Sequence, residues 1–149
     1  MASDSVQTVG QWERFEFSCC RSVSVDDPYR DLLLEVTYTR PDDTHQVFWG
    51  FYDGDNRWAA RFMPDQIGLW QYHARFSDGQ DAAHGTFRCV PSTTPGILSA
   101  LEVNPLWFGY AGTQPVLLRS FHVGDRFFAS DFSDTRRREF LDWVQAAGY

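Results

Sequence analysis

The side chains that could do chemistry are aromatic rings and carboxylates, most of them between residues 49 and 58. Aromatic rings stack on the apolar faces of sugars, and nearby carboxylates or amides bind the hydroxyl groups. The candidates for a carbohydrate-binding surface are Trp49, Tyr52, Asp53, Asp55, Asn56, Trp58 and Trp107. The alternative is structural, because tryptophans often fill a core and acidic residues around a glycine often form a turn.

Catalysis by this chain alone is not expected. Asp53 and Asp55 are close in sequence, but they flank Gly54 in a dense turn signal. Ser120 and Ser130 lack the Gly-x-Ser-x-Gly context of an activated serine nucleophile. No Cys or His spacing suits a zinc ion. We therefore predict no catalytic residue, no metal site and no cofactor in this chain.

The charge balance argues against nucleic acid and anionic membranes as partners. The net charge is -7, whereas both of those partners require a basic patch. No run approaches the roughly 18 apolar residues that a membrane-spanning helix needs, and residues 1–5 lack an apolar signal region. The three cysteines, Cys19, Cys20 and Cys89, favour reduced thiols and a cytoplasmic location. A bridge from Cys19 or Cys20 to Cys89, and secretion, remain open as alternatives.

The elements that would position the candidate side chains are β-strands separated by turns. Residues 47–52 form an apolar and aromatic run, which is typical of a buried strand. Two later runs alternate with period two, so successive side chains point to opposite faces. One face of these runs would carry Trp58, Ala60 and Phe62, then Trp70, Tyr72, Ala74 and Phe76. The opposite face of the second run would carry Leu69, Gln71, His73 and Arg75.

The segment between those two runs, residues 64–68, resembles the corner before the sixth strand of an immunoglobulin-type sandwich. In that fold an aromatic residue near the strand start hydrogen-bonds back to the corner, and a second buried residue follows two positions later. Trp70 and Tyr72 would take those two places. The indole N–H of Trp70 can donate the hydrogen bond to the corner.

Further strands would complete an antiparallel β-sandwich over residues 1–103. Strands are predicted over residues 9–20, 32–38 and 86–90, and a strand or an extended arm over residues 97–103, with turn signals between them. Seven or so short strands with frequent turns are typical of an antiparallel sandwich. We therefore predict a mostly β protein.

After residue 103 the pattern changes. Residues 104–115 suggest a hairpin linker, and residues 115–123 contain an apolar run of the kind found in a parallel strand. A helix is predicted over residues 134–147, with Ser133 or Asp134 as its cap and Gly148 as its stop. Strand, loop and helix together make residues 116–149 the opening of a βα unit. We therefore expect the chain to be a piece of something larger.

The positions with a specific pattern in the sandwich are residues 50–54, Trp58, Arg61, Phe62, Pro64, Gly68, Trp70, Tyr72 and residues 85–87. With these residues, most of the chain resembles the N-terminal immunoglobulin-like domain of bacterial apiosidase-like and related (β/α)8 glycoside hydrolases. Residues 115–119 resemble the first barrel strand, and residues 138–149 resemble the first barrel helix. Asp27-Pro28 and Ala111-Gly112 depart from the family's Asn-Pro and Asp-Gly turns.

The resemblance implies an accessory domain of a glycoside hydrolase. In such barrels the two catalytic carboxylates lie at the ends of later strands, so this chain would have neither. Arg119 and His122, at the end of the expected first barrel strand, would line a sugar subsite. The implied partners are the catalytic barrel, through an interface at residues 106–110, and an oligosaccharide or polysaccharide.

A self-associating protein is the alternative. The predicted helix carries Phe140, Trp143 and Val144 on one stripe. Without a barrel this stripe would be an exposed apolar patch, and such patches mark association sites. A homodimer through the C-terminal arm, residues 116–149, would cover it.

Overall fold

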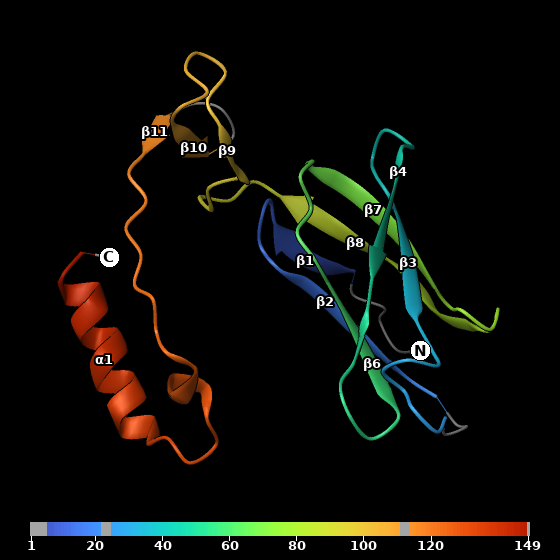
Figure 1. The fold of residues 1–149 in the computed structure, drawn as a ribbon. Coiled ribbons are helices and arrows are strands. Elements are labelled where there is room, and N and C mark those ends of the chain that lie inside the picture. The colour runs from blue at the N-terminus through green and yellow to red at the C-terminus, as the bar shows by residue number, and fades with distance from the viewer. Residues whose placement is uncertain (1–5, 22–24, 111–113, 149) are drawn as a thin grey trace. The chain divides into compact units, whose positions relative to one another are not determined.

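The computed structural model describes residues 6–21, 25–110 and 114–148 of the 149-residue chain. It divides into two compact units, unit 1 up to residue 97 and unit 2 from residue 98. Most of the regular structure is β, with open sheets that form a sandwich in unit 1 and one C-terminal helix in unit 2 (Figure 1). The predicted fold class is confirmed. The predicted domain boundaries at residues 103 and 115 stay predictions.

Unit 1 is built from two sheets. The five-stranded sheet has the order β1-β8-β7-β3-β4, formed by Gln7–Gly10, Asp81–Val90, Gly68–Phe76, Leu34–Thr39 and His45–Trp49. β1 pairs with β8 in parallel, and the other neighbours are antiparallel. The second sheet has the order β2-β6-β5, formed by Phe15–Cys20, Arg57–Phe62 and Phe51–Tyr52.

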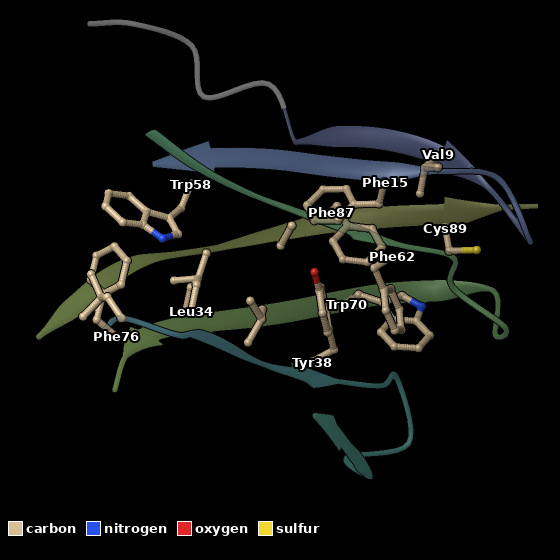
Figure 2. Packing of buried hydrophobic residues seen from close by; sticks show 14 residues of the cluster. Val9, Phe15, Leu34, Tyr38, Trp58, Phe62, Trp70, Phe76, Phe87 and Cys89 are labelled. Atoms are coloured by element: carbon tan, nitrogen blue, oxygen red, sulfur yellow. The ribbon is translucent and has the colours of Figure 1, made fainter. Parts of the chain in front are cut away.

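A layer of aromatic rings between the two sheets forms the core of unit 1 (Figure 2). Phe15 of β2 stacks on Phe87 of β8, and Tyr38 of β3 stacks on Phe62 of β6, each with ring centroids 3.9 Å apart. Burial of such a side chain contributes about 1.5–3 kcal/mol, and it also raises the pKa of the Tyr38 hydroxyl. The alternating runs predicted over residues 58–62 and 70–76 are confirmed.

The predicted corner before β7 is confirmed. Trp70 Nε1 donates a hydrogen bond to the carbonyl oxygen of Gln66 at 2.8 Å. Gly68 has a φ of 139°, and a Cβ there would approach Pro41 to 2.6 Å. Only glycine accepts both conditions without strain. The corner is therefore fixed by one hydrogen bond and one close backbone approach.

The single strand predicted over residues 9–20 is wrong, because the chain crosses between the two sheets within it. β1 belongs to the five-stranded sheet and β2 to the second sheet. Trp12 lies between them with a φ of 66°, and its backbone N–H donates to the carbonyl oxygen of Pro64 at 2.8 Å. This left-handed residue redirects the chain from one sheet to the other.

The buried strand predicted over residues 47–52 is wrong for the same reason. The chain crosses at Gly50, where a Cβ would lie 2.6 Å from Leu34 Cδ2 and 2.8 Å from the carbonyl oxygen of Ala59. The close crossing therefore requires a residue without a side chain. β4 becomes an edge strand, and Trp49 on it is 57% exposed.

Unit 2 contains a small sheet, a 3-10 turn and a helix. The sheet has the order β11-β10-β9, formed by Gln114–Val116, Phe108–Tyr110 and Leu98–Ala100. The antiparallel pairing of β10 with β11 confirms the predicted hairpin. η1 spans Asp125–Phe128 and α1 spans Asp134–Ala146. Residues 1–5 and Ala111-Gly112, which the sequence singled out, lie outside the described residues.

The predicted helix is confirmed, and the predicted strand before it is wrong. Ser133 Oγ accepts a hydrogen bond from the backbone N–H of Arg136, and Gly148 follows the helix with a φ of 76°. Trp143 packs against Phe121 with ring centroids 5.2 Å apart. The strand predicted over residues 115–123 is wrong: β11 ends at Val116 and is antiparallel to β10. The strand predicted over residues 97–103 is limited to β9.

The Trp70→Phe substitution tests the corner. It leaves the Gln66 carbonyl without its donor, so we expect the free energy of unfolding to fall by about 1–3 kcal/mol. Urea unfolding followed by circular dichroism measures the change. The matched control is Trp49→Phe at an exposed position, which we expect to change stability by less than about 0.5 kcal/mol. Equal effects of the two substitutions would contradict the role given to the corner.

Candidate functional site

The solvent-facing side of the five-stranded sheet carries a continuous set of polar side chains, and we call it the outer face. Side chains alternate along a strand. Since Leu34, Val36 and Tyr38 of β3 are buried, Glu35, Thr37 and Thr39 point outward. The neighbouring strands follow the same rule through their pairing. They add Trp49 and Val47 from β4, Leu69, Gln71, His73 and Arg75 from β7, and His84, Thr86 and Arg88 from β8. Asp81 of β8 joins them opposite Arg75, after a shift of register between Ala74 and Arg75.

Cross-strand pairing lines these side chains up in rows. In the first row, Trp49 is opposite Glu35, Glu35 is opposite Arg75, and Arg75 is opposite Asp81. The next row contains Val47, Thr37, His73 and His84. Strands are about 4.8 Å apart, so a row across β4, β3, β7 and β8 spans about 14 Å. An aromatic ring thus stands at one end of a row of charged groups.

Two hollows lie along these rows. The first, of about 390 Å³, is lined by Trp49, Glu35 and Arg75 together with Leu33, Phe76, Ser77 and Gly79. The second, of about 410 Å³, is lined by polar side chains that include Thr37, Gln71, His73 and His84. Glu35 and Thr37 are consecutive outward positions of β3, as His73 and Arg75 are of β7. The hollows are therefore neighbours on one face.

The charges of the outer face are largely matched. One oxygen of Asp81 lies 3.1 Å from His73 Nε2 and accepts a hydrogen bond from Arg75 Nε at 3.3 Å. All three side chains are more than half exposed, so each pair stabilises the fold by at most about 1 kcal/mol. Glu35 is exposed and, within the described part of the chain, has no hydrogen-bond or ion-pair partner. Its carboxylate is free to accept hydrogen bonds from a ligand.

Within unit 1, the residues predicted as a carbohydrate-binding surface do not form one surface, although the rings of Tyr52 and Trp58 lie with their centroids 4.9 Å apart. Trp49 lies on the outer face, whereas Trp58 is 1% exposed in the core and has no ring face open to a ligand. Tyr52, Asp53 and Asp55 lie on β5 and in the turn before β6, in the second sheet. Trp107 is half-exposed and belongs to unit 2.

The contacts around the β5–β6 turn are those of a structural turn. Asp53 Oδ2 accepts from Arg57 Nη2 at 2.6 Å, and the backbone N–H of Asn56 donates to the Tyr52 hydroxyl at 3.3 Å. Asp55 and Asn56 have φ values of 49° and 55°, a conformation that Asn and Asp tolerate better than most residues. The turn therefore accounts for these polar groups without a ligand.

Arg119 and His122 lie in unit 2, in the exposed segment between β11 and η1. Arg119 Nη1 donates to the carbonyl oxygen of Gly148 at 3.3 Å. No strand covers residues 117–123, so the structure does not test whether both residues lie at the end of a barrel strand. Their place in a sugar subsite stays a prediction. Across the described ranges, no three His, Cys, Asp or Glu side chains are grouped to hold a metal ion. None of the described helices has the length and apolar character needed to cross a bilayer.

Comparisons with known proteins found similarity to a protein family and to part of a solved structure. Residues 8–77 match the model of the DUF5060 family, a domain of unknown function. The chain is similar to the crystal structure of "a putative glycoside hydrolase" from Bacteroides vulgatus, with 28% sequence identity and a TM-score of 0.59. The match covers 74% of this chain and 21% of that one, so the chain spans about a fifth of the relative's length. A comparison with curated proteins gave no match.

Fluorescence quenching by iodide tests the exposure of Trp49. We expect Trp49→Phe to remove emission that iodide quenches, because the Trp49 ring is half-exposed on an edge strand. The control is Trp58→Phe, which should remove emission that iodide cannot reach, because Trp58 is buried. If both substitutions removed the same quenchable fraction, the position of Trp49 on the outer face would be wrong.

Proposed function

We propose that this chain is a non-catalytic β-sandwich module of a glycoside hydrolase, and that it packs against the catalytic (β/α)8 domain of that enzyme. The observation that carries the proposal is the match to the Bacteroides vulgatus protein, which takes in 74% of this chain and leaves most of the relative's length for other functions. The sandwich supplies a rigid body, and its role is to support the catalytic domain.

The outer face supports a non-catalytic role. Hydrolysis of a glycosidic bond ordinarily needs two carboxyl groups, one on each side of the bond. Among the residues that line the two hollows of the outer face, Glu35 is the single carboxylate. Asp81 lies at the far end of the first row and is held by His73 and Arg75. This face therefore offers hydrogen bonds rather than an acid and a nucleophile.

Unit 2 supports docking against a second domain. Within its described residues Leu101 is the one hydrophobic residue in the buried set, whereas unit 1 has an aromatic core. Its exposed apolar side chains, which we call the unit 2 apolar surface, are Val103, Leu106, Trp107, Phe108, Tyr110, Leu117, Leu118, Phe121, Phe128, Leu141 and Trp143. So much exposed apolar area marks a contact surface. We propose the catalytic domain as the occupant of this surface, because the similar glycoside hydrolase is much longer than this chain.

A charge placed on α1 tests this proposal in the protein that joins the chain to its catalytic domain. Leu141 is 54% exposed in the chain, so Leu141→Glu should hardly change the melting temperature of the chain alone. In the two-domain protein the same charge would be buried without a partner. We expect the melting temperature there to fall by about 2–8 °C, measured by differential scanning calorimetry.

The matched control is Ile67→Glu, since Ile67 is an aliphatic residue of unit 1 that is 50% exposed. It should have the same small effect in both proteins. Equal effects of Leu141→Glu in both proteins would contradict docking at α1. A chain that sediments at twice 17.2 kDa, and returns to a monomer with Leu141→Glu, would instead make a second copy the occupant.

A further inference from the structure

We infer that the outer face of the five-stranded sheet is a binding site for an uncharged oligosaccharide. The four strands β4, β3, β7 and β8 that form it lie side by side (Figure 1). The inference rests on the proposed function for the class of ligand, and on the outer face alone for the position of the site. None of the turn residues of the second sheet takes part.

Trp49 provides the stacking surface. It is on the edge strand β4, 57% exposed, and its side chain borders the hollow of about 390 Å³. An exposed indole at the rim of a hollow is costly to leave in water and offers a flat apolar surface to a sugar ring. It has no aromatic partner among the described residues. The ring is therefore available to a ligand.

Glu35 and Arg75 provide the polar groups beside that surface. They follow Trp49 in the same row, on β3 and β7. Glu35 has acceptor oxygens without partners in the described chain. Arg75 uses its Nε toward Asp81 at 3.3 Å, which leaves its terminal N–H groups as donors. A sugar stacked on Trp49 would meet an acceptor and then a donor, which suits the paired hydroxyls of a sugar.

The second hollow extends the site along the sheet. It adds hydroxyl groups from Thr37 and Thr39, the amide of Gln71 and the imidazoles of His73 and His84. These groups can each donate or accept a hydrogen bond to a hydroxyl. Successive outward residues are about 6.8 Å apart along an antiparallel strand. The two hollows together therefore suit a chain of sugars rather than a single ring.

The charges of the face select an uncharged ligand. The first row contains two carboxylates, Glu35 and Asp81, and one guanidinium, Arg75. Asp81 already pairs with Arg75 and His73, so no positive charge is left in excess in this row. Glu35 would repel a uronic acid or a sulfated sugar, because like charges at close range are unfavourable. The outer face should therefore prefer neutral over acidic polysaccharides.

Affinity gel electrophoresis of the full chain tests the inference. The probes are soluble xyloglucan, mixed-linkage β-glucan and galactomannan as neutral polymers, and polygalacturonate as the acidic one. We expect at least one neutral polymer to retard the chain and polygalacturonate to leave its migration unchanged. No retardation by any of the three neutral polymers, or stronger retardation by polygalacturonate, would overturn the inference.

Substitutions then locate the site. Trp49→Ala and, separately, the isosteric Glu35→Gln should each weaken the retardation about tenfold, which corresponds to about 1.4 kcal/mol. The control is Tyr29→Ala, which removes an aromatic ring that is 74% exposed and contacts Tyr52 of the second sheet. Unchanged melting temperatures show that the variants fold. Retardation that neither Trp49→Ala nor Glu35→Gln weakens would overturn the assignment of the outer face.

The two proposals can fail separately. If a neutral polymer retards the chain and Trp49→Ala weakens that retardation, the outer face is supported. This holds whether or not Leu141→Glu lowers the melting temperature of the two-domain protein. Conversely, a chain that docks through α1 and is not retarded keeps its role as a supporting module and loses its binding site.

Discussion

The contact on which the structure depends is the layer of stacked aromatic rings between the two sheets of unit 1. Phe15 on Phe87 and Tyr38 on Phe62 join strands from opposite layers. Because side chains alternate along a strand, the residues next to these inward rings point to the opposite face of their sheet. Glu35, between buried Leu34 and Val36, must point to solvent, and so must Arg75, between Ala74 and Phe76. The same packing that stabilises the sandwich therefore sets the chemistry of the outer face.

The parts of the fold that could be predicted from the sequence have local signals. Each of these signals spans only a few residues. They are the alternating run over β7, the corner that ends with Trp70 and the cap of α1 at Ser133. The two crossings between sheets at Trp12 and Gly50 are not local. Trp12 is held by Pro64, and Gly50 donates to the carbonyl oxygen of Leu34. Both partners are distant in sequence from the residues they hold, and no local pattern links them. The prediction therefore has a continuous strand at each crossing.

The candidate site shows the same division. Trp49 and Trp58 are near in sequence and were predicted to share a surface, but the crossing at Gly50 sends one to an edge and the other to the core. The outward positions of His73 and Arg75 followed from alternation. The place of Glu35 between Trp49 and Arg75 depends on the register of three strands, which no short motif specifies.

Unit 1 has a core of its own, whereas the regular elements of unit 2 surround few buried side chains. We therefore expect unit 1 to be stable by itself and unit 2 to depend on a partner. Amide hydrogen exchange of the chain measures this directly, because it reports the opening free energy of each element. We expect the amides of β3, β7 and β8 to exchange only by global unfolding and those of α1 to exchange at least about 100-fold faster. Protection of α1 equal to that of β7 would contradict the account.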